Sequence, residues 1–175
     1  MSEWEGLNPP YATIVADPPW RYSDQPPKGG AGRKYTTTGI DDICAMPVAD
    51  LAAPSAHLWV WGTNALMDDA YRVVRAWGFS PITVVTWCKR GPGVGHYLRN
   101  NTEHIILASR GSPMTPAERP LSTWYVWPNE GHSRKPQAAL DLIEKVSPGP
   151  YVELFARQPR LGWDHWGHGY EGQVA

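Results

Sequence analysis

Short apolar runs alternate along the chain with longer segments in which apolar residues recur every three or four positions. The short runs are rich in β-branched and aromatic residues and end at Pro, Gly or Asp, a pattern that predicts buried β-strands. The expected strands lie at residues 11–16, 57–61, 81–87, 103–108, 124–127 and 151–156. The first of them ends at Asp17-Pro18-Pro19, because proline cannot continue a central strand.

Helical periodicity predicts one helix over residues 64–77, with Asn64 as its cap and Gly78 as its end. A second helix begins at Pro136 and stops at the Pro- and Gly-containing segment 147–150. A short helix over residues 40–46 has acidic residues in its first turn, where they are favoured. The buried faces of the two longer helices consist of Leu66, Ala70, Val73, Val74 and Trp77, and of Ala139, Leu142, Ile143 and Val146.

Strands that alternate with amphipathic helices predict an α/β fold, a mostly parallel sheet with helices on both faces. In such sheets, ligands bind beyond the carboxyl ends of the strands. Two polar segments stand at such ends: residues 17–20 after the first strand, and Arg157 after the last. We therefore expect the functional site to be built from these two segments.

Composition narrows the class of protein. The chain has 175 residues, 42% of them hydrophobic, which suits a single domain over residues 1–175. A formal net charge of −1 excludes a uniformly basic nucleic-acid binder, so any such contact must come from local basic loops. Ten Trp and eight Tyr argue against disorder, and 18 Pro with 17 Gly indicate long ordered loops.

The two cysteines, Cys44 and Cys88, form neither a metal-binding pattern nor a disulfide framework. Residues 1–6 are acidic and lack an apolar run, and no stretch is long and apolar enough to span a membrane. We expect a cytoplasmic protein without a signal peptide. His165 and His168 flank Trp166-Gly167, but with no third ligand nearby we expect no metal site.

Asp17-Pro18-Pro19-Trp20 has the chemistry needed to methylate an exocyclic amine of a nucleobase. The amine lone pair is delocalised into the ring, and acceptors on both N–H groups return electron density to nitrogen. The carboxylate supplies one acceptor, and a backbone carbonyl held by Pro-Pro supplies another. The aromatic ring can stack on an extruded base. The alternative is a strand-ending turn without chemistry, in which the Asp only caps a loop.

Five segments in order resemble the MT-A family, which includes the catalytic subunit of the messenger-RNA adenine-N6 methyltransferase and many bacterial and phage adenine-N6 methyltransferases. The resemblance runs from about Tyr11 to Gly167. The matching segments are Ala16-Asp17-Pro18-Pro19-Trp20, Leu58-Trp59-Val60-Trp61, Gly95-His96-Tyr97-Leu98 with Glu103-His104, His132-Ser133-Arg134-Lys135-Pro136, and Glu153-Leu154-Phe155-Ala156-Arg157.

The resemblance implies a Rossmann-like methyltransferase fold with permuted motif order and S-adenosylmethionine as cofactor. It implies that the first motif holds the target amine and that the last strand holds the cofactor. The expected catalytic residues are Asp17, Pro18, Pro19 and Trp20. The expected cofactor-binding residues are Asp17, Lys135, Glu153, Phe155, Arg157 and His168. The expected substrate-binding residues are Tyr35, Arg33, Lys34, His96, Tyr97 and Lys135.

The chain departs from the family pattern in three places. The first is that no clear acidic, cofactor-contacting segment precedes Asp17. His168 stands where an Asn is usual after Trp166-Gly167. Pro159-Arg160 stand where relatives of the messenger-RNA enzyme have His-Asn. The cofactor must then be held differently, and we expect the charge of Arg160 to take part.

Basic residues concentrate in two Gly-rich loops that each follow a predicted strand. Residues 21–34 and residues 89–99 both have a net charge of +3. Solvated loops are one interpretation, and a phosphate-contacting rim around the site is the other. We expect a nucleic-acid substrate, DNA before RNA, with specificity from these loops or from a partner subunit. A catalytically inactive nucleic-acid-binding scaffold and a small-molecule methyltransferase are the alternatives.

Salt dependence tests whether the first loop contacts phosphate. Replacement of Arg33 and Lys34 by neutral residues should make the slope of log affinity against log salt concentration less steep by roughly two units. Filter-binding titrations over a range of salt concentrations measure this slope. An unchanged slope would exclude phosphate contacts by this pair.

Overall fold

The computed structural model describes residues 4–20, 39–91, 93, 97–113, 121–129 and 134–167. Within these ranges it forms one seven-stranded sheet in the order β5-β3-β4-β2-β1-β6-β7. The strands are β1 (Tyr11–Ala16), β2 (Ala52–Gly62), β3 (Ser80–Cys88), β4 (Thr102–Arg110), β5 (Trp124–Tyr125), β6 (Tyr151–Leu154) and β7 (Trp163–Trp166). Every pairing is parallel except those of β4, which runs antiparallel to β2 and β3. The prediction of a mostly parallel sheet is confirmed.

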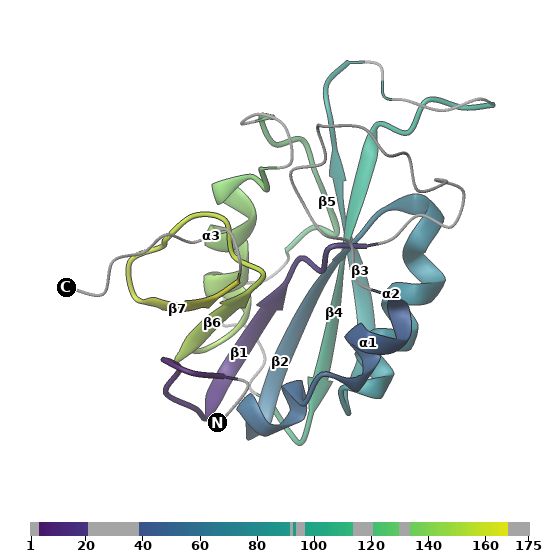
Figure 1. The fold of residues 1–175 in the computed structure, drawn as a ribbon. Coiled ribbons are helices and arrows are strands. Elements are labelled where there is room, and N and C mark those ends of the chain that lie inside the picture. Colours follow the sequence, from purple (N-terminus) through teal and green to yellow (C-terminus); the bar gives the residue numbers. More distant parts are fainter. Residues whose placement is uncertain are drawn as a thin grey trace, which may run out of the picture.

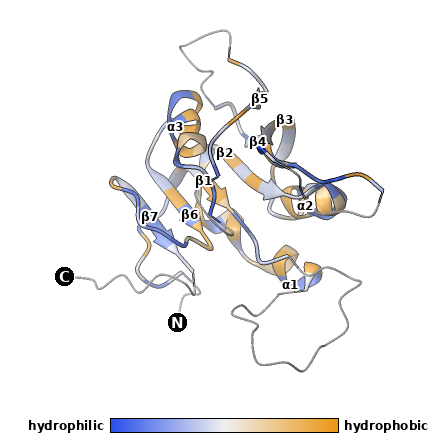
Figure 2. Ribbon diagram, turned by 90° about the horizontal axis from the view of Figure 1, so that it is seen from above, coloured by the Kyte–Doolittle hydropathy of each residue, from blue (hydrophilic) through white to orange (hydrophobic). Residues whose placement is uncertain are grey.

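Helices cover both faces of the sheet, as predicted (Figure 1). The helices α1 (Ile40–Ala45) and α2 (Met67–Ala76) pack on one face, and α3 (Gln137–Val146) packs on the other. Short 3-10 turns at Val48–Leu51 and Asn64–Leu66 precede β2 and α2. Figure 2 shows that each helix has one apolar and one polar side.

Alternation along the strands divides the core into two layers. On β2, Leu58 and Val60 face α1 and α2, whereas Trp59 and Trp61 face α3. The buried indoles also need acceptors for their N–H groups. Trp77 donates to the Ile43 carbonyl at 2.8 Å, and Trp59 donates to the Ser147 hydroxyl at 2.9 Å.

Two local predictions were wrong, and one strand was not predicted. The side chain of Asn64 does not cap α2; it reaches across to β4 and donates to Thr102 at 3.0 Å. The last predicted strand ends at Leu154, because Phe155 turns the chain with a φ of 63°. The polar, aromatic tail contributes β7, a strand that pairs with β6.

Strand direction decides which side chains meet. The carboxyl ends of β1, β2, β3 and β6 lie at one edge of the sheet, and the antiparallel β4 begins there. Asp17 follows β1 at this edge, and Glu103, the second residue of β4, pairs with Trp87 there. The chain continues from β1 to β2 and from β6 to β7, and these two next strands lie on opposite sides of the β1-β6 pair. The divergence of the two connections creates a crevice between β1 and β6, where such folds bind ligands.

Cys44 and Cys88 form no disulfide. Within the described ranges, no helix has the length and apolar character needed to cross a membrane.

The core predicts a sharp contrast between two isoleucines. Ile106 is fully buried between β2 and β3, so Ile106→Ala should lower the free energy of unfolding by about 2–5 kcal/mol. Ile82 is 56% exposed, so the matched Ile82→Ala should cost less than about 1 kcal/mol. Urea unfolding measures both, and equal losses would contradict this core.

Candidate active site

Asp17 occupies the crevice between β1 and β6 and is 7% exposed. Its backbone N–H donates to the Leu154 carbonyl at 3.4 Å, which holds the residue against β6. The following Pro18 carbonyl accepts a hydrogen bond from the Trp20 backbone N–H at 2.8 Å. The Trp20 indole donates to the Trp61 carbonyl at 3.0 Å. The whole segment 17–20 is therefore fixed against the ends of two strands.

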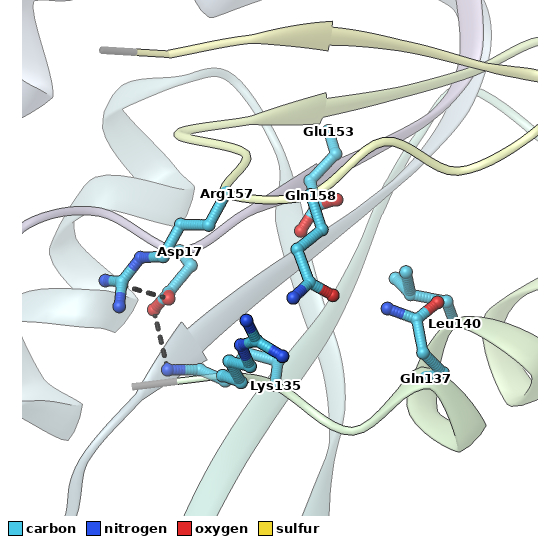
Figure 3. A pocket seen from close by; sticks show the side chains of 8 residues that line it. Asp17, Lys135, Gln137, Leu140, Glu153, Arg157 and Gln158 are labelled. Carbon is cyan, nitrogen blue, oxygen red and sulfur yellow. Dashed lines mark ion pairs between the residues drawn. The ribbon is translucent and has the colours of Figure 1, made fainter. Parts of the chain in front are cut away.

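Two cations flank the Asp17 carboxylate (Figure 3). Lys135 Nζ lies 3.0 Å from Oδ1, and Arg157 Nη2 lies 3.5 Å from Oδ2. Lys135 comes from the segment before α3, and Arg157 comes from the turn after β6. The sequence prediction thus named three residues that the fold brings into direct contact.

Lys135 is shared with a second carboxylate. Its Nζ lies 3.3 Å from Glu103 Oε2, and Lys89 pairs with the other oxygen of Glu103. The two lysines also lie over aromatic rings, Lys135 over Trp61 and Lys89 over Trp87. Opposite charges therefore alternate from Lys89 through Glu103, Lys135 and Asp17 to Arg157.

This alternation fixes the charges of the buried groups. Burial alone would lower the pKa of Lys135, but Asp17 and Glu103 outweigh burial, and the pKa is raised. Burial alone would raise the pKa of Glu103, but Lys135 and Lys89 outweigh it, and the pKa is lowered. Both side chains are therefore ionised at neutral pH.

A polar pocket opens beside Asp17 on the α3 face of the sheet (Figure 3). One wall is formed by α3 with the segment that precedes it, and the other by β6 with the turn that follows. The lining residues are Asp17, Arg134, Lys135, Gln137, Leu140, Glu153, Arg157 and Gln158. The pocket combines two carboxyl groups, three cations and an apolar side chain.

Glu153 is the unusual acid of this pocket. Burial raises its pKa to about 7, and the negative charge of Asp17 adds to the shift. The positive charges of Lys135, Arg160 and Arg157 offset only part of it. The ion pairs of Lys135 and Arg157 go to Asp17, so Glu153 feels these cations at longer range.

The other predicted site residues do not line this pocket or lie outside the residues that the structure describes. The Phe155 ring packs edge-on against Trp166, with 5.6 Å between centroids, and Phe155 is not among the residues that line the pocket. Tyr97 is fully exposed in the connection between β3 and β4. The remaining predicted residues, Tyr35, Arg33, Lys34, His96 and His168, lie outside the described ranges.

Arg160, expected to take part in holding the cofactor, is not among the residues that line the pocket. Its guanidinium forks onto α3, donating to Glu144 at 2.8 and 2.9 Å and to Asp141 at 2.7 Å. It also donates to Gln137 at 3.2 Å. Arg160 therefore ties the turn that contains Arg157 to the helix that follows Lys135.

The tail rings cover the core rather than the pocket. Trp163 stacks on Tyr151 with centroids 4.7 Å apart and donates to Glu144 at 2.7 Å. Trp166 packs edge-on against Trp4.

Glu103 was not among the predicted site residues. Its segment, Glu103-His104, matches the family, but the motif alone does not show that the carboxylate lies opposite Lys135. The missing information was the direction of β4, since only an antiparallel strand starts at the edge where Asp17 lies.

A mostly parallel sheet covered on both faces, with a polar pocket at the carboxyl ends of β1 and β6, defines a Rossmann-like α/β domain. The chain belongs to the MT-A70 family, whose model matches residues 11–169. Several of its relatives are named N(6)-adenosine methyltransferases, and MT-A70 methyltransferases take the methyl group from S-adenosylmethionine.

Bacterial and eukaryotic relatives both resemble the chain. The type II methyltransferase M.MunI of Mycoplasma sp is 29% identical over 90% of this chain and 76% of its own length. The N(6)-adenosine-methyltransferase MT-A70-like protein of Drosophila melanogaster is 26% identical over 93% of this chain. The human N(6)-adenosine-methyltransferase catalytic subunit METTL3 is 26% identical over 84%. The chain spans only 27% and 26% of the length of these two eukaryotic proteins.

The pocket fits the chemistry of S-adenosylmethionine. The cofactor combines hydroxyl donors and positive charge with one carboxylate and an apolar ring. Glu153 is a partly buried carboxyl whose ionised form is only partly compensated, and a ligand with donors or positive charge would add to the compensation. The cations of the pocket suit a carboxylate, and Leu140 offers an apolar contact.

Glu153 should make the stability of the ligand-free domain depend on pH. Its pKa in the folded domain lies above the ordinary value of 4.5, so the folded domain favours the protonated form. Stability from this group is present below about pH 4.5 and is lost as the pH rises through about 7. Glu153→Gln should therefore gain stability relative to the wild type between pH 5 and 8, by up to about 3 kcal/mol.

Glu144→Gln is the matched control for this measurement. Hydrogen bonds from Arg160 lower the pKa of Glu144, so its stabilising effect is already complete at pH 5. Urea unfolding at pH 5 and pH 8 should show a constant difference between Glu144→Gln and the wild type. A constant difference for Glu153→Gln as well would show that Glu153 is not a buried acid.

Proposed function

We propose that residues 1–175 form one methyltransferase domain that transfers a methyl group from S-adenosylmethionine to N6 of adenine in nucleic acid, with DNA as the main substrate. The observation that carries the proposal is the position of Asp17. Its carboxylate lies between the cofactor-type pocket and the rigid segment Pro18-Pro19-Trp20. This arrangement supports the proposal, because hydrogen-bond acceptors for an amine would then lie directly beside the methyl donor.

Asp17 and the Pro18 carbonyl are the proposed acceptors for the two N–H groups of the target amine. The hydrogen bond from the Trp20 N–H orients the Pro18 carbonyl and leaves its second lone pair available. Both acceptors are held in place before substrate arrives, which is the condition under which such groups stabilise a transition state. No strong base is required, because the amine proton can leave after the methyl group has been transferred.

The cations around Asp17 have a proposed positioning role. Arg157 and Lys135 hold the carboxylate in one orientation, and Lys135 has an alternative partner in Glu103 at 3.3 Å. A shift of Lys135 towards Glu103 frees Oδ1 of Asp17 for the amine without leaving a buried cation unpaired. Glu103 is therefore proposed as a positioning residue that acts through Lys135.

The cofactor would be held by the residues that line the pocket. Glu153 would accept hydrogen bonds from hydroxyl groups, and Arg157 with Arg134 would receive the carboxylate. Phe155 and His168 remain proposals for the same site from the family resemblance. When bound, S-adenosylmethionine supplies an electrophilic methyl group on a sulfonium centre.

The extent of the matches supports DNA over RNA. The bacterial type II methyltransferase matches over 76% of its length, whereas the two eukaryotic N(6)-adenosine methyltransferases match over about a quarter. We place this activity in the cytoplasm, with which the unpaired Cys44 and Cys88 agree. RNA methylation and an inactive scaffold are the competing functions.

A methyl-transfer assay separates these functions. Purified protein is incubated with methyl-labelled S-adenosylmethionine and with DNA or transcript RNA free of N6-methyladenine, and the nucleosides are analysed by mass spectrometry. The proposal expects N6-methyladenine in DNA. Product in RNA alone would favour the RNA variant, and cofactor binding without product would favour the scaffold.

Asp17→Asn should keep the shape of the site and lower turnover by ~10²- to 10³-fold, because one positioned electrostatic acceptor is lost. Cofactor binding, measured by calorimetry, should change much less. Asp41→Asn is the matched control, since Asp41 is an exposed acid on α1. Turnover of Asp17→Asn equal to that of Asp41→Asn would remove Asp17 from the mechanism.

A further inference from the structure

The hairpin between β3 and β4, residues 89–101, is anchored beside the active site. Its ends are joined by a hydrogen bond from the Lys89 N–H to the Asn101 carbonyl at 2.8 Å. Lys89 pairs with Glu103, which contacts Lys135 and through it Asp17. Figure 1 shows the described parts of the hairpin extending beyond the ends of the neighbouring strands.

A backbone contact narrows the hairpin. A Cβ atom placed on Gly93 would lie 1.8 Å from the carbonyl oxygen of Asn100, so the two arms touch there and only glycine fits. Beyond this neck, the described part of the tip includes Tyr97, Leu98 and Arg99. The chain from Leu98 to Glu103 spans at most about 18 Å when extended, which keeps the tip close to the site.

The tip presents two large apolar side chains to solvent. Tyr97 is 102% exposed and Leu98 is 82% exposed. Such exposure is unfavourable unless a partner covers it. Lys89 is paired with Glu103, but the arms also contain the exposed Arg90 and Arg99, and residues 89–99 contain no acid, so the tip projects from a positively charged hairpin. This charge favours a polyanion as the partner rather than an apolar protein face.

The buried position of Asp17 creates a geometric requirement. An adenine inside a duplex cannot reach a carboxylate that is 7% exposed, so the base must leave the stack. Its departure leaves a gap whose neighbouring bases have lost stacking partners. Apolar side chains inserted between base steps are a general means of stabilising such a gap.

We propose that Tyr97 and Leu98 form a wedge that enters duplex DNA and fills the space left by the extruded adenine. The proposal rests on the function proposed above and adds a specific interaction with the duplex. Arg90 and Arg99 contact the flanking phosphates, and the Tyr97 ring stacks on an exposed neighbouring base. The hairpin then acts only on paired substrates, because a single strand has no gap to fill.

Duplex and single-stranded substrates provide the test. Tyr97→Ala/Leu98→Ala should methylate native double-stranded plasmid DNA free of N6-methyladenine about 10- to 100-fold more slowly than the wild type. On the same plasmid after heat denaturation, its rate should stay within about threefold of the wild type. Tyr97→Phe should behave as the wild type on both, since stacking needs the ring and not the hydroxyl.

Ile82→Ala is the matched control, an apolar truncation at the opposite end of β3 that should not alter either rate. Equal losses on both substrates, or no loss on the duplex, would overturn the wedge. A second readout does not depend on methylation: wild-type protein should raise the fluorescence of duplexes containing 2-aminopurine, and the double variant should not. Unstacking without any methylation by the wild type would refute the proposed function and keep the wedge, whereas no unstacking would refute the wedge.

Discussion

The arrangement of this site depends on how one buried carboxylate is compensated. Asp17 lies where β1 ends, and an ionised group there is costly unless it is paired. Lys135 and Arg157 provide the pairing from segments far apart in sequence, and Glu103 with Lys89 extends it. The same ion pairs therefore stabilise the carboxylate and join β1, β4, β6 and the segment before α3 at one point.

Much of the fold follows from the sequence because its apolar patterns are strong. Central strands such as β1 are continuous apolar runs, and the periodic face of α3 is unambiguous. The pairing of β7 with β6 was not predicted, since Trp163 and Trp166 lie in a polar segment and their packing depends on tertiary contacts. Asn64 was misjudged for a similar reason: a residue suited to a cap instead found its partners on β4.

The site residues that belong to local sequence motifs were predicted. Asp17, Lys135, Glu153 and Arg157 were named from their segments, and the fold places all four around one pocket. Glu103 and Gln137 were not named. The role of Glu103 depends on the antiparallel direction of β4, and that of Gln137 depends on the hydrogen bonds between Arg160 and α3. Arg160 shows the converse: its charge suggested a ligand contact, but three side chains of α3 already use its donors.

The Arg160 fork has a consequence for how sequence variation at this surface is read. Asp141 is 60% exposed and would ordinarily count as a replaceable surface acid. Here it belongs to a clasp that holds the two walls of the pocket together, one bearing Lys135 and the other Arg157. Substitutions on the outer side of α3 are thus not neutral for the ligand. They can change the distance between the two walls, and with it the shape of the ligand that fits, although the substituted residues do not line the cavity.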